Sequence, residues 1–499
     1  MIDIGVILSG FSDAVTFYNF CFVLMGIAFG QFIGAMPGIG PVAAMAVAIP
    51  FTFGINSLTA IAFLVGINKG GLFGGAIPSI LINTPGSPDA AATTLDGYPM
   101  TQNGKPEKAL KMALYASVTG DAASDVLLIT VSPLIAAVAL KMGPIEILAL
   151  MIFAFSIISA LVGDSMMKSI MSAALGLFFA TVGLDPENST PRFIFGWLEL
   201  YSGFHLVSVA LGMLAVAEIF RRLSMISGKS VPAVRIPKTQ KKEDRRISLA
   251  EYWSCRYTIL RGFIVGSVFG AIPGLDSSAA AFMTYGMVKQ TSKDPDSFGK
   301  GNIHGIAATE SANSSVCGAN CIPMLTLGIP GNAAAAMIIT ALMIHGVQPG
   351  PLLFHEQGRL IYGIFGSFLM ANVANLFIGL FGLRVWARVI RAPESFIFTA
   401  ALILCIVGVY ITTGGLFGVG AMFFFGVLGY LMNAFGYSPI VLVIAFFLGE
   451  RFELSLSQSL NIIDGNFMMV LTRPVALALF FLAIFSFYWL GLRPNRKKS

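Results

Sequence analysis

The sequence predicts an all-α polytopic membrane protein with two inverted structural repeats, whose broken or re-entrant helices meet near the bilayer midplane. Composition is the first observation: of 499 residues, 56% are hydrophobic and only 11% are charged, whereas a soluble domain carries about 25% charged residues. Many apolar stretches reach the roughly 20 residues that one bilayer crossing needs. The second observation is a duplication. Each half holds a hydrophobic segment broken by Pro-Gly, which is typical of duplicated transporters.

The duplication is visible in two blocks of residues. Residues 26–38 have the pattern Gly-x3-Gly-x3-Gly-Ala-Met-Pro-Gly, and residues 262–274 repeat its spacing 236 positions later (262 minus 26). A second block, residues 68–86, returns as residues 313–331, 245 positions later (313 minus 68). The nine extra residues fit the polar insert at residues 289–301. A fainter echo, shifted by 253, relates residues 176–186 to residues 429–439.

These blocks suggest an order of segments along the chain: a mildly acidic lead-in at 1–20, a first transmembrane repeat at 21–220, a basic linker at 221–256, a second repeat at 257–450, and a C-terminal span with a basic tail at 451–499. Basic residues far outnumber acidic ones in the linker. The positive-inside rule therefore places the linker and the tail in the cytoplasm. Because the two repeats carry opposite charge biases, we expect inverted topology, with the N-terminus outside.

Two segments of the first half should not be ordinary membrane helices. Residues 21–67 are apolar but are cut at residues 37–41 by Pro-Gly-Ile-Gly-Pro. Proline removes a backbone donor and glycine permits non-helical angles, so two half-helices are expected there. Residues 68–99 are too polar and glycine-rich for a lipid-facing helix, and we expect a re-entrant or interrupted segment that lines a cavity.

Apolar spans account for most of the remaining chain. In the first half they lie near residues 112–140, 144–162, 166–184 and 201–220. In the second half they lie near residues 257–289, 360–382, 395–412, 415–433, 437–450 and 474–492. A small, polar helix at residues 309–315 leads to the second-half Pro-Gly break at 330–331.

The breaks at Pro37-Gly38 and Pro273-Gly274 are the first candidate binding site. The first N–H groups of a half-helix lack intrahelical partners, and its dipole end is positive. Such an end can hold a carboxylate without a fixed cation. A packing kink is the alternative for one such break, but duplication in register favours a site. The predicted ligands here are Pro37, Gly38, Gly40, Gly274 and Ser277.

The second Pro-Gly turn of each half offers hydroxyl, amide and free N–H groups, which suit an anion or Na⁺. Turn chemistry alone also explains Pro-Gly-Ser and Pro-Gly-Asn. The predicted substrate-binding residues at these turns, and in the polar helical segments before them, are Asn68, Lys69, Thr84, Pro85, Gly86, Ser87, Asn313, Ser314, Pro330, Gly331 and Asn332.

Charge at membrane depth costs at least about 2.5–3.5 kcal/mol and so indicates function. Six ionisable residues are candidates: Lys69, Asp89, Asp121, Asp125, Asp276 and Glu310. We expect Asp89 and Asp125 near a membrane interface, where the cost vanishes. Lys69, beside the repeated Asn68, is expected within reach of a bound carboxylate. Asp276 and Glu310 are candidate ligands for a coupling Na⁺. The alternative is that these residues are structural.

Other patterns favour structure over chemistry. The glycines at four-residue spacing indicate close helix packing, and support for a sliding helix is an equal alternative. Cys317 and Cys321 are interpreted as packing residues, because no histidine stands at ligand spacing. No Ser-His pair and no phosphate-binding loop is evident in the sequence, so we expect neither an enzyme nor direct ATP drive.

Several motifs together resemble a known family, the large permease subunit of the tripartite tricarboxylate transporters, over roughly residues 20–490. They are Gly34-Ala35-Met36-Pro37-Gly38-Ile39-Gly40-Pro41, Asn68-Lys69-Gly70-Gly71, Asn83-Thr84-Pro85-Gly86-Ser87, Asp96-Gly97-Tyr98-Pro99 and Gly328-Ile329-Pro330-Gly331-Asn332. The resemblance implies symport of a carboxylate such as citrate with an ion, usually Na⁺. It also implies two partners, a small four-span membrane subunit and a periplasmic solute-binding protein, and a location in the bacterial inner membrane.

From the residues alone we infer a secondary transporter for a small anion. An anion-selective channel or a non-transporting membrane scaffold is the alternative from another class. A channel would need a continuous pore, and a scaffold would not need polar, broken helices in both halves. No cofactor other than the coupling ion, Na⁺ or H⁺, is expected.

Overall fold

The computed structural model describes residues 4–36, 40–161, 165–225, 243–389, 394–466 and 468–488. Helices make up nearly all of the ordered elements in these residues. The one strand pair described is a short antiparallel ladder of β1 (Gly183–Leu184) and β2 (Pro191–Arg192). The predicted all-α class is thereby confirmed.

Within the part of the chain that the structure describes, five helices are long and apolar enough to cross a membrane. These segments are Phe17–Gly34, Ser57–Ile82, Pro106–Ala139, Gly358–Gly382 and Leu416–Ala434. Shorter apolar helices occupy several of the other predicted spans. The chain is therefore a helical membrane protein, as its composition predicts.

The helices form two compact units, and each unit draws on both halves of the sequence. Unit one comprises Met1–Ile135, Ile226–Ile272 and Asp276–Ala401, and unit two comprises Ala136–Met225, Pro273–Leu275 and Leu402–Ser499. The units thus cut across the sequence repeats. Pro37, Gly38, the centre of the basic linker and the basic tail lie outside the described residues.

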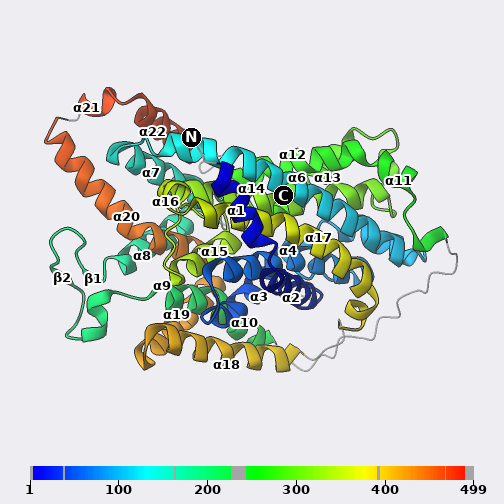
Figure 1. Cartoon of the computed structure of the whole chain (residues 1–499), viewed down its shortest axis with the longest axis horizontal. Helices are drawn as coiled ribbons and strands as arrows, with labels where there is room; N and C mark the ends of the chain where they lie inside the picture. The colour runs from blue at the N-terminus through cyan, green and yellow to red at the C-terminus, as the bar shows by residue number, and fades with distance from the viewer. Residues whose placement is uncertain are drawn as a thin grey trace. The chain divides into compact units, whose positions relative to one another are not determined.

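Unit one contains most of the helices that carry the predicted site. Figure 1 labels α4, α14 and α15 among them. From the first half come α1 (Ile4–Ala14), α2 (Phe17–Gly34), α3 (Pro41–Ala48), α4 (Ser57–Ile82), α5 (Thr94–Gln102) and α6 (Pro106–Ala139), with short 3₁₀ turns at Ile49–Thr52 and Pro88–Ala90; the last residues of α6 belong to unit two. From the second half come α12 (Arg256–Ala271), α13 (Ser277–Gln290), α14 (Ile303–Leu327), α15 (Ala333–Ile344), α16 (Pro351–Glu356) and α17 (Gly358–Val389), preceded by α11 (Leu249–Ser254) and 3₁₀ turns at Glu243–Arg245 and Pro295–Ser297.

Unit two is also helical. Its first-half elements are α7 (Pro144–Leu161), α8 (Met166–Ala180), the β1–β2 ladder, a 3₁₀ turn at Leu198–Ser202, α9 (Leu206–Ala210), a π-helical turn at Leu211–Val216 and α10 (Ala217–Met225). Its second-half elements are α18 (Glu394–Thr413, from Leu402 onward), α19 (Leu416–Ala434), α20 (Pro439–Ile463), α21 (Met468–Leu471) and α22 (Pro474–Ser486).

In unit one, α2 packs against α4 and α12 packs against α14. The repeated glycines form both contacts. A Cβ added at Gly30 of α2 or at Gly266 of α12 would lie under 3.0 Å from backbone of the partner helix, at Ile67 and Ala312 respectively. The remaining glycines of both stripes are equally crowded. The packing role predicted for them is confirmed.

The helix boundaries also follow the duplication. Helix α4 ends with Asn83 in the left-handed conformation (φ 57°), and α14 ends with Gly328 in the same conformation (φ 72°), 245 positions later (328 minus 83). Helices α3 and α13 begin at Pro41 and Ser277, 236 positions apart (277 minus 41). The two halves are therefore built alike, and their inverted orientation stays a prediction.

The segment at residues 68–99, for which the sequence predicts a re-entrant or interrupted backbone, is irregular only in part. Helix α4 runs unbroken through residues 68–82 and includes Pro78. Gly70 and Gly74 pack closely on Ile27 and Gln31 of α2. Close helix contact offsets the low helix propensity of glycine, and the irregular backbone begins only at Asn83.

Candidate functional site

The turn that follows α4 lies tightly against two helices. The Gly86 N–H donates to Gly75 O of α4 at 3.2 Å, and a Cβ at Gly86 would collide with Gly34 O at the end of α2. Gly86 and Ser87 are buried, whereas Thr84 is exposed. Only glycine fits at position 86, so this part of the predicted site is a backbone feature held in place by packing.

The turn that follows α14 repeats this arrangement. A Cβ at Gly331 would collide with Asn320 Oδ1 of α14 and would lie 3.5 Å from Gly270 O at the end of α12. The contacted positions are the repeat equivalents of those in the first half. Asn332 then caps α15, because its Oδ1 accepts the Ala335 N–H at 3.0 Å. A helix N-terminus therefore begins directly at the buried Pro-Gly turn.

The other pair of Pro-Gly breaks, at residues 37–38 and 273–274, lies only partly within the described residues. Gly40 precedes α3, and a Cβ there would lie 3.4 Å from Ser87 Cβ. Gly274 has φ +89°, which favours glycine, and it belongs to unit two, where it packs on Ile158 of α7. Ser277 belongs to unit one, so the two predicted ligands Gly274 and Ser277 fall in different units.

Two carboxylates from opposite halves meet at the start of α13. Asp276 is exposed, and its Oδ1 accepts the Ser277 N–H at 2.9 Å. The Ser277 hydroxyl donates to Asp89 Oδ1. Asp276 is thus the N-cap of α13, and its Oδ2 accepts the Ser278 hydroxyl at 3.3 Å, whereas Asp89 is only half-buried.

Buried polar atoms without partners mark the middle of α14. Glu310 and Asn313 lie one turn apart and are both 0% exposed. Glu310 Oε1 accepts a hydrogen bond from the Thr93 hydroxyl. Among the described residues, Glu310 Oε2 and both amide atoms of Asn313 have no hydrogen-bond partner. Each unpaired buried group costs about 1–3 kcal/mol, so these atoms are suited to meet a ligand.

Neighbouring polar residues of the predicted site connect α14 to α4 and α6. The Asn68 Nδ2 donates to Cys317 Sγ at 3.2 Å. The hydroxyls of Ser314 and Ser117 lie 2.6 Å apart. All four side chains are buried. The interior of unit one therefore brings together polar residues of α4, α6 and α14.

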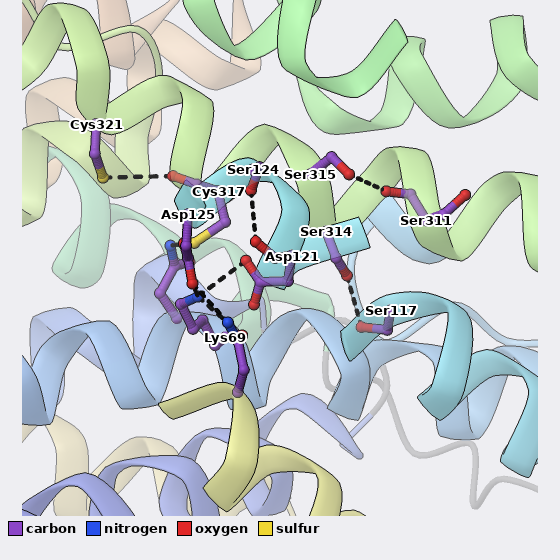
Figure 2. Close-up of polar contacts among 12 residues, drawn as sticks. Lys69, Ser117, Asp121, Ser124, Asp125, Ser311, Ser314, Ser315, Cys317 and Cys321 are labelled. Atoms are coloured by element: carbon purple, nitrogen blue, oxygen red, sulfur yellow. Dashed lines mark hydrogen bonds and ion pairs between the residues drawn. The ribbon is translucent and has the colours of Figure 1, made fainter. Parts of the chain in front are cut away.

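Lys69 lies at the centre of a buried charged network (Figure 2). Its Nζ is 3.0 Å from Asp121 Oδ1, 2.6 Å from Asp125 Oδ2 and 3.0 Å from Asn372 Oδ1. The ammonium donates hydrogen bonds to Asp125 and Asn372 and forms an ion pair with Asp121. The side chains of Lys69, Asp121 and Asp125 are 0%, 2% and 0% exposed. The ring of Phe368 lies 4.9 Å from Nζ.

This network corrects one prediction and adds one residue. Asp125 was expected near a membrane interface, but it is fully buried against Lys69 because the ammonium compensates its charge. Asn372 was missed. The signal available was the pair Asn372 and Asn375, two amides one helical turn apart in an apolar run. That Lys69 contacts a bound carboxylate stays a prediction.

Asp96 has a role that the sequence alone did not reveal. It is 1% exposed, and its Oδ1 accepts backbone N–H groups from Gly299 (2.9 Å), Gly301 (2.9 Å) and Asn302 (2.7 Å). Its Oδ2 accepts the Tyr285 hydroxyl at 3.0 Å. Asp96 thus ties the polar segment of the first half to the start of α14 in the second.

Comparison with known proteins agrees with the motifs. The model of the tripartite tricarboxylate transporter TctA family matches residues 20–444. A protein of Agrobacterium vitis described as an uncharacterized 52.8 kDa protein in the TAR-I ttuC' 3' region is 34% identical over 472 residues, which cover 94% of this chain and 92% of the relative. A second protein from that organism, described as an uncharacterized protein in the TAR-II ttuC' 3' region, is 34% identical over 214 residues, 43% of this chain and 88% of the relative.

No solved structure matches the chain. The family model nevertheless covers both repeated blocks and every residue of the predicted site. This chain therefore belongs to the tripartite tricarboxylate transporter TctA family.

Proposed function

We propose that this chain carries a small carboxylate, such as citrate or another tri- or dicarboxylate, across the bacterial inner membrane by symport with Na⁺. Family membership makes it the large membrane subunit of a tripartite tricarboxylate transporter. Its proposed partners are a small four-span membrane subunit and a periplasmic solute-binding protein that captures the substrate. In this proposal an ion gradient, rather than ATP, supplies the driving force.

The observation that carries the proposal is the pair of Pro-Gly turns at 85–86 and 330–331, whose glycines are buried and held by equivalent contacts in both halves. Helix α15 starts at the second turn, so its free N–H groups and positive dipole end are directed toward this region. Such ends bind carboxylates. A tricarboxylate also needs several donors, which the nearby amides and hydroxyls can supply.

The coupling cation needs oxygen ligands beside the substrate. Glu310 Oε2 and Asn313 Oδ1 are buried oxygens without partners among the described residues, and carboxyl and carbonyl oxygens coordinate Na⁺ in other secondary transporters. Asp276 is the third proposed ligand. A cation that moves with the anion offsets an electrical cost of about 2.3 kcal/mol per elementary charge per 100 mV.

Uptake by the assembled three-component system in ATP-free vesicles tests this proposal. Labelled citrate should accumulate when an inward Na⁺ gradient is imposed and should stop accumulating when the Na⁺ and H⁺ gradients are both collapsed. An anion-selective channel would equilibrate citrate without accumulating it, and a scaffold would not move it at all. Accumulation that persists without either gradient would refute secondary transport.

The cation site has a matched pair of variants on one helix. Glu310→Gln should raise the Na⁺ concentration for half-maximal uptake by about ten- to a hundredfold, because a charge-assisted contact is worth roughly 1.5–3 kcal/mol. Ser315→Ala is the control, since its hydroxyl donates at 2.6 Å to Ser311 O of its own helix. An unchanged Na⁺ dependence in a normally expressed Glu310→Gln protein would exclude this residue as a ligand.

A further inference from the structure

The Lys69 network holds one more negative charge than positive charge. Two aspartates face one lysine, and all three side chains are at most 2% exposed. Among the described residues, Lys69 is the one cation paired with either aspartate. An uncompensated charge buried away from water is so unfavourable that a titratable group takes up or loses a proton instead.

The contacts distinguish the two carboxylates. Asp125 Oδ2 receives Lys69 Nζ at 2.6 Å and also Asn372 Nδ2 at 2.6 Å. Asp121 meets Nζ through Oδ1 at 3.0 Å, the longer of the two ion pairs. Hydrogen bonds donated to a carboxylate favour its ionised form. Asp125 is therefore the ionised partner of Lys69, and Asp121 is left to carry the neutralising proton.

Among the described residues, the helices around this network supply no second positive charge paired with either aspartate. Helix α4 contributes Lys69 itself, and α14 contributes the buried thiols of Cys317 and Cys321 (Figure 2). Helix α17 contributes the amide of Asn372 and the ring of Phe368. Because Nζ lies within 3.0 Å of an oxygen of each aspartate, the position between them where a metal ion would sit is filled. A proton is the cation that this geometry accommodates.

We propose that Asp121 is a proton-binding site, and that its proton is released to water when the network opens during transport. In that step the Asp121 O–H bond breaks, the electron pair stays on the carboxylate, and the proton passes to water. Carboxylate uptake then moves a proton in addition to the coupling Na⁺. This second part rests on the proposed transport function, whereas the proton site itself does not.

Infrared spectroscopy of the purified full chain tests the site without any transport. The wild type should show the carbonyl band of a protonated carboxyl group that Asp121→Asn lacks. Ser124→Ala is the control on the same helix turn, because its hydroxyl donates at 2.9 Å to the backbone O of Asp121 and carries no charge. An asparagine keeps an acceptor for Lys69, so the fold should persist. The same band in wild type and Asp121→Asn would overturn the proposal.

Two further variants test the charge count itself. Asp125→Asn should also lose the band, because Asp121 then ionises to balance Lys69. Lys69→Met should instead gain a second protonated carboxyl group. A band that survives in Asp125→Asn would overturn the assignment even if Asp121→Asn failed to fold.

A transport assay tests the release step. Na⁺-driven citrate uptake by wild-type vesicles should change the internal pH, and Asp121→Asn should lose this pH change while Ser124→Ala keeps it. Citrate uptake by the wild type with no pH change would overturn proton release. Failure of Na⁺-driven uptake in the wild type would instead contradict the proposed function, and the infrared result would still decide the proton site.

Discussion

At the scale of single residues, buried carboxylates connect segments far apart in the sequence. Asp96 receives four donors from residues 189 to 206 positions away, three of them backbone N–H groups. Backbone N–H groups in the irregular segment 299–302 have no acceptors within a helix. The Asp96 carboxylate accepts their hydrogen bonds instead. Asp96 is therefore a structural residue that connects the first-half and second-half segments of unit one.

Asp96→Ala should lower the free energy of unfolding by at least about 3 kcal/mol, because several buried donors lose their acceptor at once. Tyr285→Phe removes one of these donors and should cost only about 1.5 kcal/mol. Thermal unfolding of the detergent-solubilised variants measures both effects. Equal stability of Asp96→Ala and Tyr285→Phe would show that the backbone contacts contribute little.

The polar residues also show how far sequence reasoning reaches at this scale. The sequence makes Lys69 a candidate because a charge within an apolar segment is costly to bury. In the structure, two aspartates lie beside that charge. Asp125 was misplaced and Asn372 was missed because their partner lies 56 and 303 positions away. Hydropathy along the chain does not report which helix faces which.

At the scale of elements, the repeated helix pairs depend on glycine. Each stripe lets a helix backbone approach its partner so closely that no Cβ fits. The same crowding explains why α4 stays helical through Gly70, Gly71, Gly74 and Gly75, since packing on both sides fixes its backbone.

Gly30→Ala and Gly266→Ala should each destabilise the protein by about 1–3 kcal/mol, because the added methyl group overpacks the interface. Gly286→Ala in α13 is the matched control, since a Cβ there meets nothing within 4 Å. It should be neutral or stabilising by up to about 1 kcal/mol. The comparison is made by thermal unfolding in the same detergent. A similar loss of stability in all three variants would indicate that helix flexibility, rather than close packing, sets the effect.

At the scale of the whole molecule, the two halves of the sequence are not the two units of the structure. Each half supplies helices to both units, so neither half makes a complete unit by itself. The charge pattern still predicts opposite orientations for the halves, with the linker in the cytoplasm and the N-terminus outside.

Single cysteines at positions 3 and 241, in a protein whose five native cysteines are replaced, test this topology. A membrane-impermeant thiol reagent should label position 3 from outside and position 241 only from the cytoplasmic side. An impermeant reagent cannot cross the bilayer, so the two positions report their own faces. Labelling of both from one side would contradict the inverted topology.

The sequence by itself determined the membrane class, the duplication, the position of the Pro-Gly turns and the family, because these depend on composition and on spacing along the chain. Only the tertiary structure decided that α4 is continuous, that Asp125 is buried, that Asn372 joins the Lys69 network and that Asp96 ties the halves together. Each of these depends on which distant helix lies alongside. A buried charge or a glycine-rich helix is stabilised by its neighbours, and one-dimensional periodicity does not identify them.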